Sequence, residues 1–123
     1  MNLNKKILII DDDTISLTII KKLLCSSFQL LMAENAYQAL KIIDKNNAPD
    51  LIIVDIHLPG INGVELIKTL KTMEKVKSAS IIVISGLDDE HYKSTLKNMG
   101  VENILLKPID RESFKKLVKN ILV

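Results

Sequence analysis

The residues of this 123-residue chain best suited to chemistry are polar groups that directly follow short apolar runs. They are carboxylates, a hydroxyl and an ammonium group, at Asp11, Asp12, Asp13, Asp55, Ser85 and Lys107. Carboxylates gathered in one place repel one another, so such a cluster is costly unless a cation joins it or some groups take up protons. A hard divalent cation relieves that repulsion, and Mg²⁺ commonly uses one or two carboxylates, retained waters and a phosphoryl oxygen.

Together, these groups are suited to phosphoryl transfer. An aspartate carboxylate can act as the nucleophile, while a metal ion, a lysine and a hydroxyl bind the equatorial oxygens of the phosphoryl group. This chemistry requires the groups to meet, so it depends on the elements that carry them.

The apolar runs that precede these residues predict buried β-strands at residues 7–10, 51–54, 81–84 and 104–106. Their apolarity is continuous rather than alternating, as a parallel sheet covered on both faces requires, because neither side of such a strand meets water. Residues Gln29–Ala33 are a weaker candidate for a fifth strand.

Helical patterns fill the segments between these runs. Apolar residues spaced i, i+3, i+4 and i+7 predict two amphipathic helices, through Ala36, Ala39, Leu40 and Ile43 and through Phe114, Leu117, Val118 and Ile121. Segments 14–27 and 64–73 supply two more helices, and a further helix should stop at Gly100. Asn35 and Asp110 occupy positions where helix N-caps belong.

This alternation of strands and helices specifies a doubly wound α/β sheet. In such a sheet, ligands bind beyond the carboxyl ends of the strands, at the point where the strand order reverses. The polar groups stand at those ends, so we expect them to converge on one site.

Composition excludes several classes of function. Apolar residues make up 47% and charged residues 26%, which excludes disordered and fibrous classes. The formal charge of +2 is too small to indicate nucleic acid or an anionic membrane as a partner, and 3% aromatics argue against base-stacking surfaces. The single cysteine, Cys25, cannot form an internal disulfide and is compatible with a reducing cytoplasm. No apolar run approaches the ~20 residues of a membrane span. We therefore expect a cytoplasmic protein of one domain, residues 1–123.

Four segments carry a more specific signal: Ile-Ile-Asp11-Asp12-Asp13, Asp55-Ile-His-Leu-Pro59-Gly60-Ile-Asn-Gly63, Ser85-Gly86 and Lys107-Pro108. In this order, on these strand ends, they resemble the receiver domain of bacterial two-component response regulators. The resemblance covers essentially the whole chain. It implies a flavodoxin-like fold, a five-stranded parallel sheet in the order 2-1-3-4-5 with helices on both faces.

The resemblance also implies roles for the carboxylates. Asp55 would accept the phosphoryl group, and Asp11, Asp12, Asp55 and the backbone carbonyl of His57 would hold Mg²⁺. Asp13 is better suited to capping the helix that follows it. The His57 side chain has no partner at metal-ligand spacing and should face solvent.

Ser85 would be the hydroxyl that moves to bind the phosphoryl group, and Lys107 would pair with that group through its ammonium. The peptide bond between Lys107 and Pro108 would be cis. The chain departs from the family at Ile104, where an aromatic residue usually moves with the hydroxyl, and at Ile109, where Phe is common. We therefore expect a weaker coupling between phosphorylation and the distant surface.

The implied partner is a sensor histidine kinase or a histidine phosphotransfer protein, whose phosphohistidine donates the phosphoryl group. We expect a signalling domain that promotes only its own phosphorylation and dephosphorylation, contacts neither nucleic acid nor membrane, and acts on an output partner or output domain. Met1 directly before the first strand favours a stand-alone or N-terminal receiver. Ile15 and Ile19, one turn apart beside Asp12, are expected to contribute a docking surface for the partner.

Two other classes fit less well. Asp11-Asp12-Asp13-Thr14 approaches the Asp-x-Asp-x-Thr signature of haloacid dehalogenase-type phosphatases, which also form an aspartyl phosphate, but its threonine comes one place early. A flavin carrier of similar fold would need a Ser/Thr-rich phosphate loop and flanking aromatics, which the sequence lacks. Cys25 is expected to be a small buried apolar group in the first helix.

Overall fold

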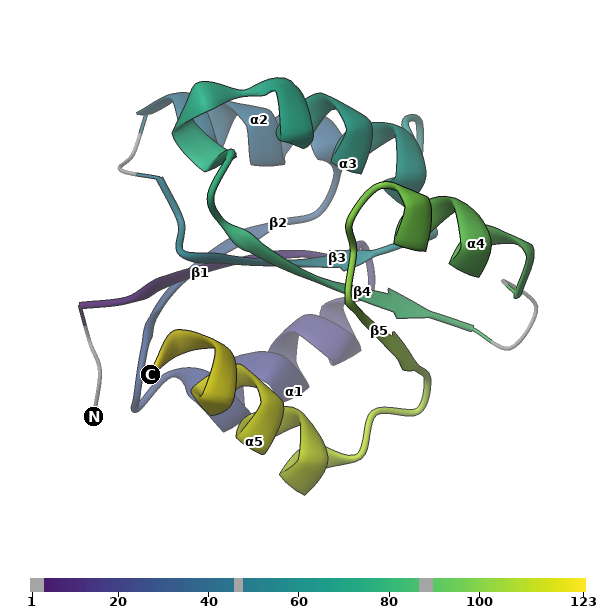
Figure 1. Ribbon diagram of the computed structural model, residues 1–123. Helices are drawn as coiled ribbons and strands as arrows, with labels where there is room; N and C mark the ends of the chain where they lie inside the picture. Colours follow the sequence, from purple (N-terminus) through teal and green to yellow (C-terminus); the bar gives the residue numbers. More distant parts are fainter. Residues whose placement is uncertain (1–3, 46–47, 87–89) are drawn as a thin grey trace.

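A computed structural model of the chain describes residues 4–45, 48–86 and 90–123. In that part of the chain, parallel strands form one five-stranded sheet in the order β2-β1-β3-β4-β5 (Figure 1). The strands are β1 (Lys6–Ile10), β2 (Gln29–Ala33), β3 (Leu51–Asp55), β4 (Ser80–Ser85) and β5 (Asn103–Leu106). The five predicted strands, including the weaker candidate, are thereby confirmed, and so is the order implied by the resemblance.

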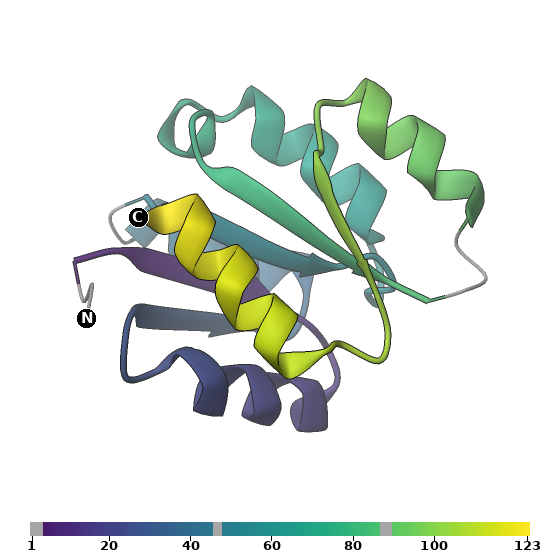
Figure 2. The same cartoon turned by 60° about the horizontal axis from the view of Figure 1, so that its bottom comes forward.

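Helices cover both faces of the sheet, as the doubly wound prediction requires. They are α1 (Thr14–Leu24), α2 (Ala36–Lys45), α3 (Gly63–Thr72), α4 (Glu90–Asn98) and α5 (Arg111–Leu122), with a 3₁₀ turn η1 (Glu74–Val76). Helices α2, α3 and α4 lie on one face, and α1 and α5 lie on the other (Figure 1). Figure 2 shows α1 and α5 running side by side.

The central strands explain why the predicted runs are continuously apolar. In β1, Leu8 and Ile10 pack into the core under α2 and α3, while Ile7 and Ile9 pack into the core under α1 and α5. Burying each such side chain contributes about 1.5–3 kcal/mol. All five residues of β3 are buried as well.

Polar caps fix where the helices begin. Asp13 accepts a hydrogen bond from the backbone N–H of Ile15 at the start of α1, and Asp110 accepts one from the N–H of Ser113 at the start of α5. Asn35 accepts one from the N–H of Gln38 at 2.8 Å. The three predicted caps are confirmed, and they set the helix starts beside the carboxyl edge of the sheet.

Helix ends were harder to predict. Helix α1 ends at Leu24, three residues before the predicted end at Ser27, because Cys25 is its C-cap and the N–H groups of Ser27 and Phe28 turn back to the Leu24 carbonyl. Cys25 is exposed, so the prediction of a buried apolar cysteine was wrong. Gly100 adopts φ +88° after α4, as its predicted role as a helix stop requires.

No helix within the described ranges has both the length and the apolar composition needed to cross a membrane.

Candidate functional site

The carboxyl ends of β1 and β3 bring the predicted acidic residues together. The strands pair in register, Ile10 beside Val54, so the residues that follow them, Asp11 and Asp55, meet at the sheet edge. Asp11 is 1% exposed and Asp55 3% exposed, whereas Asp12 faces solvent. Carboxylate oxygens of all three lie within 4.8 Å of one another.

Both oxygens of Asp55 are engaged. Lys107 Nζ donates a hydrogen bond to Asp55 Oδ2 at 2.8 Å, and the backbone N–H of His57 donates one to Oδ1 at 3.0 Å. Burial lowers the pKa of Lys107, but the hydrogen bond and the charge of Asp55 outweigh this effect and raise the pKa above its ordinary value. Lys107 is therefore a fixed cation beside the buried carboxylate.

Asp11 is in a less favourable position. Its Oδ1 accepts a hydrogen bond from the backbone N–H of Asp13 at 2.9 Å, but the buried Oδ2 has no hydrogen-bond donor among the described residues. Desolvation by burial, opposed by the Asp13 hydrogen bond and reinforced by the neighbouring Asp55, raises the pKa of Asp11 to about 6. A proton or a cation at Oδ2 would relieve this unfavourable burial.

These features fit a hard divalent cation. The donor set consists of oxygens alone, which suits Mg²⁺, and the orphaned Oδ2 of Asp11 is an acceptor that a cation would satisfy. Exposed Asp12 leaves the group open to water, which Mg²⁺ retains.

The other predicted groups lie at the same edge. Ser85 ends β4, is 3% exposed, and its carbonyl accepts a hydrogen bond from the Lys107 N–H at 2.8 Å. The Lys107–Pro108 peptide bond is cis, as the resemblance implies. The side chain of His57 is exposed, as predicted.

Asp13 stands apart from this acidic group. Its side chain caps α1 and accepts hydrogen bonds from Ile15 N and Ser16 Oγ, both at 3.0 Å, which lower its pKa. In a haloacid dehalogenase-type site, Asp13 would be the second aspartate of the signature, and its carboxylate would have to take part in the reaction. Here its oxygens hold the helix start instead.

The two departures from the family pattern pack on opposite faces. Ile104 is half-buried and packs against the core on the α4 side, which Tyr92 and Met99 also contact. Ile109 is half-buried and packs against the core under α1 and α5. No aromatic side chain therefore occupies the β5 position usually coupled to the switch hydroxyl.

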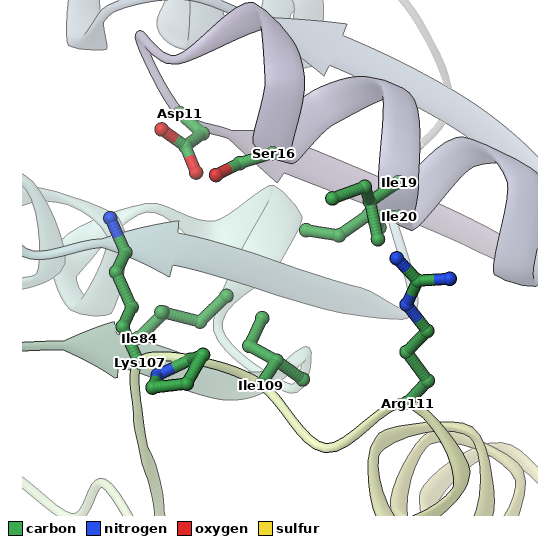
Figure 3. Close-up of a pocket in the computed structure, with 9 residues that line it drawn as sticks. Asp11, Ser16, Ile19, Ile20, Ile84, Lys107, Ile109 and Arg111 are labelled. Atoms are coloured by element: carbon green, nitrogen blue, oxygen red, sulfur yellow. The ribbon is translucent and has the colours of Figure 1, made fainter.

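A cavity of about 460 Å³ adjoins the acidic group, and no sequence pattern predicts it. It opens between α1 and the loop from β5 to α5, and its walls include Ile19, Ile20 and Ile109 (Figure 3). Asp11 and Lys107 line one end and Arg111 lines the other. Finding Arg111 from sequence would require knowing that α1 and α5 are neighbours, which only the strand order determines.

The two residues predicted to form a docking surface on α1 differ in exposure, and their contact with a partner stays a prediction. Ile15 exposes 69% of its surface, which makes it an outward-facing apolar side chain. Ile19 is half-buried and lines the cavity.

Comparisons with known proteins agree with this geometry. Residues 7–119 match the model of the response regulator receiver domain. Sporulation initiation phosphotransferase F of Bacillus subtilis is 29% identical, with 98% of this chain and 95% of that protein covered. A putative response regulator of known structure from Chloroflexus aurantiacus is 30% identical, with a TM-score of 0.86, over 96% of this chain and 97% of that one.

Other relatives are longer. Two-component response regulator ORR1 of Oryza sativa subsp. indica is 26% identical over 93% of this chain but only 54% of its own length. The chain thus spans about half of several curated relatives that it matches.

Proposed function

The chain belongs to the family of response regulator receiver domains, and we propose that residues 1–123 form one receiver that accepts a phosphoryl group on Asp55. The observation that carries the proposal is the buried Asp55 carboxylate, held by Lys107 on one oxygen and flanked by Asp11 and Asp12. The donor is the phosphohistidine of a sensor histidine kinase or a histidine phosphotransfer protein.

The transfer is a displacement at phosphorus. An Asp55 oxygen forms a bond to phosphorus while the phosphorus–nitrogen bond of the donor histidine breaks, and the imidazole leaves with the electron pair. In this proposal, the Lys107 ammonium pairs with one phosphoryl oxygen, and the Ser85 hydroxyl donates a hydrogen bond to another. Both contacts stabilise negative charge that would otherwise accumulate beside Asp11.

Asp11, Asp12, Asp55 and the backbone carbonyl of His57 would hold Mg²⁺. When bound, the cation neutralises the carboxylates and draws charge from the phosphoryl oxygens. Without it, Asp11 and Asp55 leave the pocket with two buried carboxylates against one ammonium, that of Lys107. That imbalance makes labelling of Asp55 dependent on the metal.

The output of the reaction is a change of surface rather than a released product. We infer that the domain acts on no substrate other than itself, promoting its own phosphorylation and dephosphorylation, and that an output partner or a further domain reads the result. A cytoplasmic location follows from its dependence on a phosphohistidine donor. We propose no contact with nucleic acid or a membrane, because a net charge of +2 is too small to attract either of these anionic partners.

The proposal is tested by labelling with acetyl phosphate and Mg²⁺, followed by intact-mass measurement. We expect one added phosphoryl group on the unaltered protein and none on Asp55→Ala or after addition of EDTA. Asp13→Ala is the matched control, since it removes a neighbouring carboxylate that caps α1 and should keep the label. Labelling of Asp55→Ala at the rate of the unaltered protein would overturn the proposal.

A further inference from the structure

The turn that follows β3 carries two of the groups that the proposed function uses. Asp55 ends the strand, and the backbone N–H of His57 donates a hydrogen bond to Asp55 Oδ1 at 3.0 Å. His57 also supplies the backbone carbonyl proposed as a metal ligand. The position of the Asp55 carboxylate relative to that carbonyl therefore depends on the backbone of residues 55–57.

Ile56, in the middle of this turn, is held through both of its backbone polar groups. Its N–H donates a hydrogen bond to the carbonyl of Ile84 on β4 at 3.0 Å, and its carbonyl accepts one from the N–H of Gly63 at 2.8 Å. Gly63 is the first residue of α3, and the first N–H groups of a helix have no partner within it. The turn is therefore fixed between the neighbouring strand and the start of α3.

The contact between Gly63 and the turn leaves no room for a side chain. A Cβ atom at position 63 would lie 2.6 Å from Ile56 Cα and 3.0 Å from the Asp55 carbonyl oxygen. Non-bonded carbon atoms pack at about 3.5–4.0 Å, so one of the two backbone segments would have to move. Gly63 does not have a positive φ, so close approach, and not an unusual backbone conformation, requires glycine here.

We propose that Gly63 is a positioning residue for the phosphorylation site. It lets α3 begin against the backbone of residues 55 and 56, and this contact sets the position of the Asp55 carboxylate relative to the His57 carbonyl. The inference rests on the proposed function, in which both groups would hold Mg²⁺. Gly63 itself touches no reacting atom, so its effect passes through the turn.

Gly63→Ala tests this assignment, and Gly60→Ala is its matched control. Gly60 lies in the same loop, but a Cβ atom there would have no other atom within 4 Å. Because Gly60 has φ +79°, alanine is unfavourable there, so the control also costs stability without pressing on residues 55 and 56. Both variants and the unaltered protein are compared where circular dichroism shows all three folded. If Gly63→Ala is only partly folded, sucrose is added to all three samples, since it favours the compact state.

Isothermal titration calorimetry measures Mg²⁺ affinity without reference to phosphorylation. We expect the Kd for Mg²⁺ to rise at least tenfold in Gly63→Ala and to stay within threefold in Gly60→Ala. Amide hydrogen exchange in EDTA gives a metal-free readout of the turn. Protection of the His57 amide should fall at least tenfold in Gly63→Ala and stay within threefold in Gly60→Ala.

A purely structural role would lower the melting temperature of Gly63→Ala without changing either readout in the folded protein. Unchanged Mg²⁺ affinity and unchanged His57 protection in Gly63→Ala would therefore overturn the assignment, as would equal losses in the two variants. If the unaltered protein took no label from acetyl phosphate while Gly63→Ala still lost His57 protection, the proposed function would be refuted, and Gly63 would keep its role in holding the turn.

Discussion

Asp11 is the residue whose environment departs most from that of a free side chain. It is almost fully buried, one of its oxygens has no donor among the described residues, and its pKa is raised to about 6. Lys107 hydrogen-bonds to Asp55 rather than to Asp11. At neutral pH, the buried carboxylate of Asp11 is therefore the least stabilised charge of the pocket unless a cation binds to it.

This environment predicts a pH dependence of stability. The unfolded chain ionises Asp11 near its ordinary pKa of 3.8, whereas the folded chain ionises it near 6, so between these pH values the folded state binds more protons. The contribution of Asp11 to the free energy of unfolding therefore falls as pH rises from about 4 to 6. Asp11→Asn does not titrate, so in EDTA it should gain roughly 1–3 kcal/mol relative to the unaltered protein over this window.

Urea unfolding of both proteins at pH 4.5, 6 and 7.5 measures the difference. A stability difference that stays constant across the three pH values would contradict the assignment of the raised pKa to Asp11.

At the scale of elements, α1 begins directly after the acidic residues of β1 and carries the contact surface expected for the partner, Ile15 and Ile19. Its N-cap, Asp13, is fixed by two hydrogen bonds, so the first turn and Ile15 are held at the edge of the pocket. Ile15 is exposed while Leu17 and Ile20 are buried, which separates a surface stripe from a core stripe on one helix.

Ile15→Ser should therefore affect the partner and leave the fold intact. Because Ile15 is 69% exposed, we expect the free energy of unfolding to change by no more than about 0.5 kcal/mol. Transfer from the cognate phosphohistidine should slow about tenfold, with labelling by acetyl phosphate unchanged. Tyr37→Ser, an exposed apolar residue on α2, is the control and should leave transfer unaffected. Equal rates for Ile15→Ser and the unaltered protein would remove Ile15 from the contact surface.

The second element of interest is β5, where Ile104 replaces the aromatic residue of the usual switch. Ile104 packs against the core beside α4 and has no ring to exchange between exposed and buried positions. Movement of Ser85 therefore has less to couple to on the α4 side.

Beryllofluoride, which mimics the phosphoryl group, tests this in amide NMR spectra. We expect large shifts around Asp55, Ser85 and Lys107 and small shifts across residues 92–99. Ile104→Tyr should enlarge the shifts in residues 92–99 if the missing ring limits coupling. Shifts in that segment as large as those at the pocket in the unaltered protein would show that the ring is not needed.

At the scale of the whole molecule, topology explains why the site forms. Helices α1 and α5 lie on one face of the sheet, and α2, α3 and α4 lie on the other (Figure 1). The strand order reverses direction after β2, so β1 lies beside β3 in the middle of the sheet. Asp11 and Asp55, 44 positions apart, therefore meet at the crevice between two central strands. Ser85 and Lys107 arrive from the next two strands of the same edge.

Much of this arrangement is predictable from the sequence, because the strands are continuously apolar and each polar group directly follows one. Local patterns also predict the caps at Asp13, Asn35 and Asp110. They do not predict the exposure of Cys25, since hydropathy does not reveal that α1 has already ended. The position of Arg111 in the wall of the cavity beside the acidic group is not predicted either, because it depends on the contact between α1 and α5, which no local pattern encodes.

The central claim is that the Asp55 carboxylate receives the phosphoryl group, and its most direct test is to locate the modification. Borohydride reduces an aspartyl phosphate to homoserine, so reduction after labelling with acetyl phosphate and Mg²⁺, followed by peptide mass mapping, marks the acceptor. Homoserine at position 55, and unmodified aspartate at positions 11 to 13, is the result that we predict. Homoserine at position 11, with Asp55 unmodified, would contradict the account.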